Sequence, residues 1–136
     1  MKSALVITAA IAALATVTAA SAASTATITI RHQVRGCHTW SVNGGPYAAS
    51  QSLRLARNGT ITIVDNDVMP HKLIQKSGPA VRLVGKPGMN HMGASVKVVF
   101  AKPGSYRFTT NPGEDYMAGM KTIGEDNVLR LTVTVP

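Results

Sequence analysis

The sequence has little cysteine and few acidic residues. The first limits the disulfides that can form, and the second makes the chain basic. Its 136 residues include a single cysteine, Cys37, so no disulfide can form within the chain. Six Asp and Glu stand against 14 Lys and Arg, which gives a formal net charge of +8. The basic residues are scattered along the chain, and aromatic residues make up only 4 % of it. This composition does not indicate a nucleic-acid-binding protein.

Helical periodicity and catalytic motifs are missing as well. After the N-terminal segment no apolar stripe with helical spacing runs for ten residues, which argues against a helical domain. We find no nucleophile and base motif, no paired acid and base carboxylates and no glycine-rich phosphate loop. The sequence therefore predicts that the protein is not an enzyme, although an enzyme whose metal has an open coordination position stays as an alternative.

The N-terminus has the pattern of a secretory signal. Lys2 precedes an apolar run over residues 4–20, and the small residues Ala20, Ser21 and Ala22 follow at the position of a cleavage site. We expect residues 1–23 to be a signal peptide and residues 24–136 to be one domain that is periplasmic or secreted. An uncleaved anchor is the alternative; once the signal is removed, no stable membrane insertion is expected.

The rest of the chain has the short alternating runs of an all-β protein. Residues 26–34 place Ile28 and Ile30 on one face and Thr27 and Thr29 on the other, which is the period of a half-buried strand. Further strands are expected at 39–42, 52–57, 60–64, 72–75, 96–100, 106–110 and 128–135, with a tight turn at Asn58-Gly59. Many short strands between Gly and Pro turns predict an antiparallel sandwich or barrel.

Residues that could bind a metal gather in a few places. They are His32, Cys37 and His38, then Met69 and His71, then Met89, His91 and Met92, and finally Met117 and Met120. If neighbouring strands alternate in direction, the strand before Gly36 and the strand 60–64 end at the same pole. Cys37 and His38 are then expected to face His71, and the methionine-rich loop 89–92 is expected to face Met117 and Met120. Strand direction alone does not decide whether the two groups share a pole.

Two segments resemble the cupredoxin family. Asn58-Gly-Thr-Ile-Thr-Ile-Val-Asp-Asn-Asp-Val-Met-Pro-His71-Lys-Leu73 is similar to the cupredoxin strand that leads through Pro-His into the copper site. Lys102-Pro-Gly-Ser-Tyr-Arg-Phe108 resembles the turn and strand before the ligand loop, and Met120 with the last strand resembles its exit. The resemblance runs in order over essentially the whole chain after the signal. It implies a Greek-key β-sandwich with all of these loops around one copper pocket.

The chain departs from the family at the ligand loop. Thr110 stands where the resemblance implies a copper-binding cysteine, and no histidine follows in residues 111–117. Cys37 could bring a thiolate from another loop to His71, and thioether donors favour copper over zinc. We therefore predict copper as the cofactor, and the candidate metal ligands are Cys37, His38, His71, His91, Met92, Met117 and Met120.

Each candidate also has a structural alternative. Cys37 could be a small buried apolar residue, and His71 could cap the turn at Pro70. His38 could face solvent or the core. The loop with His91 and Met92 could be an ordinary surface loop, and Met117 and Met120 could fill the core.

Three functions fit this interpretation. The first is electron transfer through a mononuclear copper site, with a redox partner that could be acidic because the chain is basic. The second is a copper chaperone, storage or resistance protein that binds Cu(I), with a copper donor or acceptor protein as partner. The third is a cupredoxin-like interaction domain without a metal.

Overall fold

The computed structural model describes residues 22–32, 38–112 and 128–136, and these residues form only strands, turns and loops. The strands are β1 (Ala23–His32), β2 (His38–Val42), β3 (Ser50–Asp65), β4 (His71–Ser77), β5 (Arg82–Val84), β6 (Gly88–Met89), β7 (Ser95–Val99), β8 (Gly104–Pro112) and β9 (Arg130–Val135). Among these residues no helix is long and apolar enough to cross a membrane.

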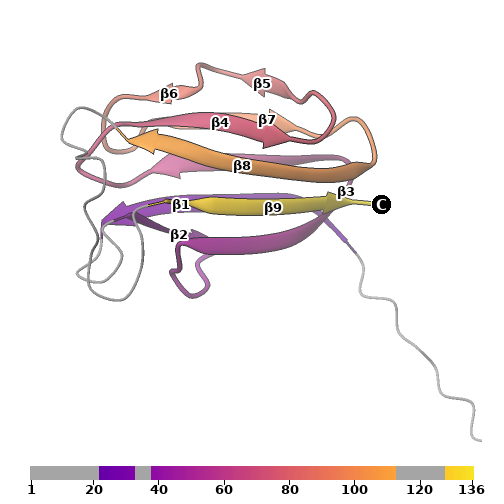
Figure 1. Cartoon of the computed structure of the whole chain (residues 1–136), viewed down its shortest axis with the longest axis horizontal. Coiled ribbons are helices and arrows are strands. Elements are labelled where there is room, and N and C mark those ends of the chain that lie inside the picture. Colours follow the sequence, from indigo (N-terminus) through magenta and orange to yellow (C-terminus); the bar gives the residue numbers. More distant parts are fainter. Residues whose placement is uncertain (1–21, 33–37, 113–127) are drawn as a thin grey trace, which may run out of the picture.

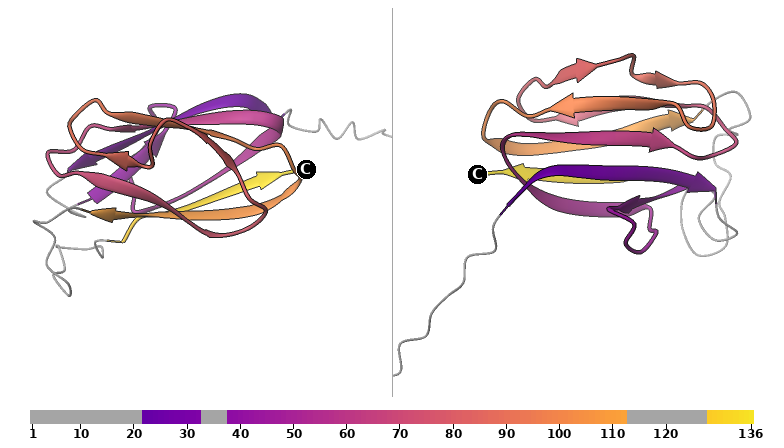
Figure 2. Two further views of the ribbon diagram at one scale, coloured as in Figure 1. Left: turned by 90° about the horizontal axis from the view of Figure 1, so that it is seen from above. Right: turned by 180° about the vertical axis from the view of Figure 1, so that it is seen from behind.

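The strands pack as two layers, so the expected β-sandwich is confirmed (Figures 1 and 2). The first sheet has the order β2-β1-β3-β7-β5, and the second has the order β3-β9-β8-β4-β6. β3 belongs to both sheets. Its first residues, from Ser50 to Arg54, pair with β9, and its last residues, from Thr60 to Val64, pair with β7.

The Asn58-Gly59 dipeptide is not a hairpin turn, as the sequence suggested, but lies inside β3. Asn58 has a φ of 62°, and its amide nitrogen donates to the Phe100 carbonyl at 2.8 Å. The amide nitrogen of Phe100 donates in turn to the Gly59 carbonyl at 3.0 Å. The dipeptide thus produces the local twist that lets one long strand pass from one sheet to the other.

Two strand pairings are parallel, whereas the sequence pattern indicated an antiparallel fold. β1 runs antiparallel to β2, but the chain then crosses to the other side of β1, where β3 pairs with it in parallel. β3 and β9 are also parallel. Because Ile30 pairs with Asp65, β1 and β3 end at the same pole of the sandwich, as expected from the sequence. This pole carries the polar cluster described below.

The core lies between the two sheets and follows the alternation of the strands. Ile28 and Ile30 of β1 pack with Ile61 and Ile63 of β3, and all four are buried. Trp40 of β2 is fully buried, and its indole nitrogen donates to the Ala49 carbonyl at 3.0 Å. Across the two layers, Phe100, which follows β7, packs edge to face against Tyr106 and Phe108 of β8.

We predict that Gly59→Ala destabilises the sandwich by about 1–3 kcal/mol, the usual cost of overpacking a core. A Cβ at Gly59 would lie 2.6 Å from Leu55 Cγ and 2.7 Å from the Ala56 carbonyl oxygen. Gly88→Ala is the control, because the nearest atom there is Asn90 Oδ1 at 3.4 Å. Urea unfolding measures both variants. Equal stability of the two would contradict this account of the β3 bend.

Candidate metal centre

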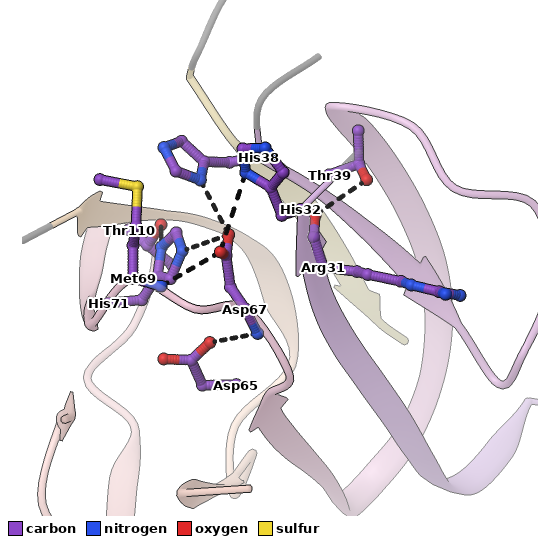
Figure 3. Close-up of polar contacts among 9 residues, drawn as sticks. All are labelled: Arg31, His32, His38, Thr39, Asp65, Asp67, Met69, His71 and Thr110. Carbon is purple, nitrogen blue, oxygen red and sulfur yellow. Dashed lines mark hydrogen bonds and ion pairs between the residues drawn. The ribbon is translucent and has the colours of Figure 1, made fainter. Parts of the chain in front are cut away.

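The polar cluster is assembled from four strand ends at one pole of the sandwich (Figure 3). β1 ends at His32 and β2 begins at His38, and the two residues are paired in the sheet. β3 ends at Asp65, two residues before Asp67, and β4 begins at His71. The ends of antiparallel and parallel neighbours thus bring together residues that lie up to 39 positions apart in the sequence.

The carboxylate of Asp67 is the centre of this cluster. His38 Nδ1 lies 2.9 Å and His71 Nε2 lies 3.2 Å from the same oxygen, Asp67 Oδ2. The two rings meet edge to face, with centroids 4.9 Å apart. The other oxygen, Oδ1, accepts the backbone N–H of Met69 at 3.2 Å. Because Asp67, His38 and His71 are all buried, these contacts are sheltered from water.

The hydrogen bonds to Asp67 define the protonation of the cluster. Hydrogen bonds from His38, His71 and the Met69 amide lower the pKa of Asp67 well below its ordinary value, although burial opposes them. An ionised carboxylate only accepts hydrogen bonds, so His38 carries a proton on Nδ1 and His71 carries one on Nε2. His71 Nδ1, 2.9 Å from Thr110 Oγ1, then accepts the Thr110 hydroxyl proton. His71 is therefore held at both ring nitrogens.

Asp65 supports the cluster from below. Its Oδ1 accepts the backbone N–H of Asp67 at 3.0 Å, which fixes the turn between the two acidic residues. Its Oδ2 is buried and has no hydrogen-bond partner among the described residues. Burial raises the pKa of Asp65, so the two neighbouring carboxyl groups shift in opposite directions.

His32 lies at the solvent side of the cluster. Its Nδ1 is 4.0 Å from Asp67 Oδ1, and its side chain is 48 % exposed. The rings of His32 and His38 are 6.3 Å apart. One possible ligand atom from each of His32, His38 and Asp67 lies within 4.8 Å of the other two. Among the described residues, these three side chains therefore form a group that could hold a metal ion.

The structure brings two of the sequence-predicted ligands together and separates others. His38 and His71 face each other, as expected from the strand directions. Cys37, Met117 and Met120 lie outside the described residues. His91 is exposed and its Nδ1 contacts the Met92 carbonyl oxygen at 3.2 Å, and Met92 is exposed too.

Met89, which the sequence placed in the same loop group, belongs to the core instead. It is fully buried and pairs with His71 at the edge of the second sheet. The structure thus shows no contact of His91 or Met92 with His38 or His71, and their role as ligands stays a prediction.

Sequence reasoning missed Asp67 and Thr110 as parts of the centre. Asp65-Asn-Asp67 follows a strand and has the composition of an ordinary turn, although a carboxylate four residues before His71 is a usable signal. Thr110 was noted only because it is not a cysteine. Its hydroxyl bonds to His71, so the position is still part of the cluster.

Comparisons with known proteins find similar solved structures. No family model and no curated protein matches the chain. Solved cupredoxins are among the similar structures, as the sequence resemblance predicted. A purple cupredoxin from Nitrosopumilus maritimus is 20 % identical with a TM-score of 0.47, over 80 % of this chain and 99 % of that one. A mutant of amicyanin with Cu(I) is 14 % identical with a TM-score of 0.43, over 81 % and 82 % of the chains.

A protein of another kind is found at the same level. A cysteine protease inhibitor from Entamoeba histolytica is 10 % identical with a TM-score of 0.42, over 82 % of this chain and 97 % of that one. A fold does not by itself imply a function, so the function has to be argued from the site.

The donor atoms present fit a copper ion. Imidazole nitrogens suit copper and zinc, and Cu(II) binds a given set of N and O donors more tightly than the other divalent first-row metals. His38 and Asp67 present such donors 2.9 Å apart. This is close to the separation of about 3 Å between neighbouring ligands that are each about 2.0–2.2 Å from one ion.

We predict that Thr110→Val destabilises the protein by about 1–3 kcal/mol, because His71 Nδ1 loses its hydrogen bond while it stays buried. Thr110→Ser keeps the hydroxyl and is the matched control, with a smaller loss. Chemical denaturation of the metal-free protein compares the two. If valine is tolerated as well as serine, the Thr110 hydroxyl does not hold His71.

Proposed function

We propose that this chain is an exported copper-binding protein that holds one copper ion at the His38, Asp67 and His71 pole and transfers electrons. The observation that supports it best is the convergence of imidazoles from separate strand ends on one buried carboxylate. Bound copper supplies a one-electron couple. The chain's own residues orient the donors, exclude water and keep the rings in place.

The arrangement of the pole suits electron transfer because its inner side is rigid. His71 is bonded at both ring nitrogens, to Thr110 and to Asp67. Asp67 itself is bonded through both carboxylate oxygens. A donor set that moves little when the charge of the ion changes keeps the reorganisation energy small. His32, with about half of its side chain exposed, reaches the molecular surface beside this rigid part.

Three predicted sulfur ligands complete the proposal. Cys37 directly precedes His38 in the chain, so a thiolate could reach an ion bound near His38. Met117 and Met120 come from the segment between β8 and β9, and β8 ends beside His71. We propose one of the two as a thioether ligand. A cysteine in an exported protein without a disulfide partner is consistent with a metal-bound thiol.

Copper delivery is the second candidate function, and the loop before β7 supports it. His91 and Met92 are exposed, and the loop lies at the same pole, because the Gly93 amide nitrogen donates to the Asp65 carbonyl at 2.6 Å. Exposed imidazole and thioether groups next to the cluster could pass Cu(I) to another protein. Variants of this loop separate delivery from electron transfer.

The charge distribution of the surface supports an acidic partner protein. Every described Lys and Arg is exposed, while the described acidic residues, Asp65 and Asp67, are buried. On the outer face of the second sheet, Lys76, Arg107 and Arg130 line a hollow of about 510 Å³ together with serine and threonine hydroxyl groups. Guanidinium groups bind carboxylates in a bidentate manner, so we propose that this face docks an acidic protein.

We predict that one equivalent of Cu(II) added to the reduced protein without residues 1–23 gives an intense thiolate-to-copper absorption band. Cys37→Ser should abolish the band, and His71→Ala should weaken copper binding. Absorption and EPR spectra measure both effects. Tight Cu(I) binding without a reversible redox couple would favour delivery, and lack of binding of either ion would leave a metal-free interaction domain.

We predict that binding to an acidic polypeptide, poly-glutamate, weakens at least about tenfold in the double variant R107E/R130E. The control R82E/K97E makes the same change in net charge on strands β5 and β7 of the first sheet. Binding of both should fall as the salt concentration rises. Equal weakening of the two doubles would show that only net charge matters. Preference for anionic lipid vesicles over poly-glutamate would instead assign the face to a membrane surface.

A further inference from the structure

The carboxylate at the centre of the cluster is not one of the ligands that the sequence or the cupredoxin resemblance indicates. We infer that Asp67 is itself a metal ligand, together with His32 and His38, and that these three side chains form a two-histidine, one-carboxylate site for a divalent transition metal. This inference rests on the proposed copper function and assigns its ligands. It also gives His71 a different role, that of a positioning residue.

The distances of the three donors support a common ion. His38 Nδ1 is 2.9 Å from Asp67 Oδ2, and His32 Nδ1 is 4.0 Å from Asp67 Oδ1. All three side chains have a ligand atom within 4.8 Å of the others. Ligands about 2.0–2.2 Å from one ion lie at most about 4.4 Å apart. The His38–Asp67 and His32–Asp67 distances already meet this limit.

His71 lies on the inner side of the carboxylate and is already fully used. Its Nε2 bonds to Asp67 and its Nδ1 bonds to Thr110, so both ring nitrogens have buried partners, and His71 is not one of the three side chains whose donors lie within 4.8 Å of one another. Ligating carboxylates are commonly held by such outer hydrogen bonds, which orient them. His71 therefore keeps Asp67 turned toward His38 and His32 (Figure 3).

Metal binding requires the other tautomer of His38. In the metal-free protein the Nδ1 proton of His38 lies between the imidazole and the carboxylate. When His38 becomes a ligand through Nδ1, this nitrogen gives up its proton and the neutral ring carries its proton on Nε2, so that the Nδ1 lone pair binds the ion. The neutral ring keeps one proton, and no oxidation state changes.

The carboxylate also affects which ion is bound. Carboxylate oxygen is a hard donor and favours divalent ions, whereas thioether and thiolate sulfur favours Cu(I). With two imidazoles and a carboxylate, Cu(II) is expected to bind most tightly, ahead of Zn(II) and Fe(II). Three protein donors would leave room for a further ligand from the chain or from solvent.

The test uses the protein without residues 1–23 and Cu(II) alone, in competition with a chelator. We expect Asp67→Asn to lower the Cu(II) affinity by more than the roughly 10–100-fold cost of losing an outer-sphere partner. The Cu(II) that still binds should have changed EPR g and hyperfine values. His32→Ala should remove one nitrogen from the count obtained by pulsed EPR. Lys97→Ala is the control, because this exposed side chain of β7 is not a candidate ligand, and it should leave the spectrum unchanged.

The outcomes separate the inference from the proposed function. If the unmodified chain binds no Cu(II), both fail. If it binds Cu(II), but Asp67→Asn and His32→Ala bind it equally well with an unchanged spectrum, copper binding stands and the assignment of Asp67 and His32 is wrong. Should Asp67→Asn fail to fold by circular dichroism, the exposed His32 still allows the test.

Discussion

The contacts of the Asp67 carboxylate hold one pole of this protein together. A buried anion is costly unless hydrogen bonds and opposite partial charges surround it. Here the donors come from His38 on β2, His71 on β4 and the Met69 backbone. Each of these groups is in place only because the two sheets bring their strand ends to one point. The fold and the cluster therefore depend on each other, since removing the carboxylate would leave two buried imidazole N–H groups without an acceptor.

Much of the fold could be predicted from local patterns, and the parts that could not depend on distant contacts. The alternation of Ile28, Ile30, Ile61 and Ile63 indicates half-buried strands without any knowledge of their partners. The same local pattern does not distinguish parallel from antiparallel neighbours, so the β1–β3 pairing was missed. Asn58-Gly59 has the composition of a hairpin turn, but backbone hydrogen bonds to Phe100 make it a bend within one strand.

The candidate site, like the fold, could be predicted only in part from the sequence. That His38 would face His71 followed from the directions of strands, and the structure agrees. Asp67 was missed because an Asp-Asn-Asp segment after a strand is also the composition of an ordinary turn. What distinguishes it is burial, which a single sequence does not reveal. The sequence predicted sulfur ligands besides histidines, whereas the described part of the cluster offers nitrogen and oxygen donors.

The buried Asp65 and Asp67 and the exposed basic side chains together determine the electrostatics of this pole. A divalent ion at this pole would add positive charge to a described surface whose charged side chains are all cationic. Asp67, ionised and buried, supplies the negative charge that such an ion needs, while burial favours the neutral form of Asp65. If both carboxyl groups were ionised, their repulsion would weaken the metal-free fold. Burial thus works against a negative charge on Asp65, while the hydrogen bonds to Asp67 favour one there, on the carboxylate that faces the proposed ligands.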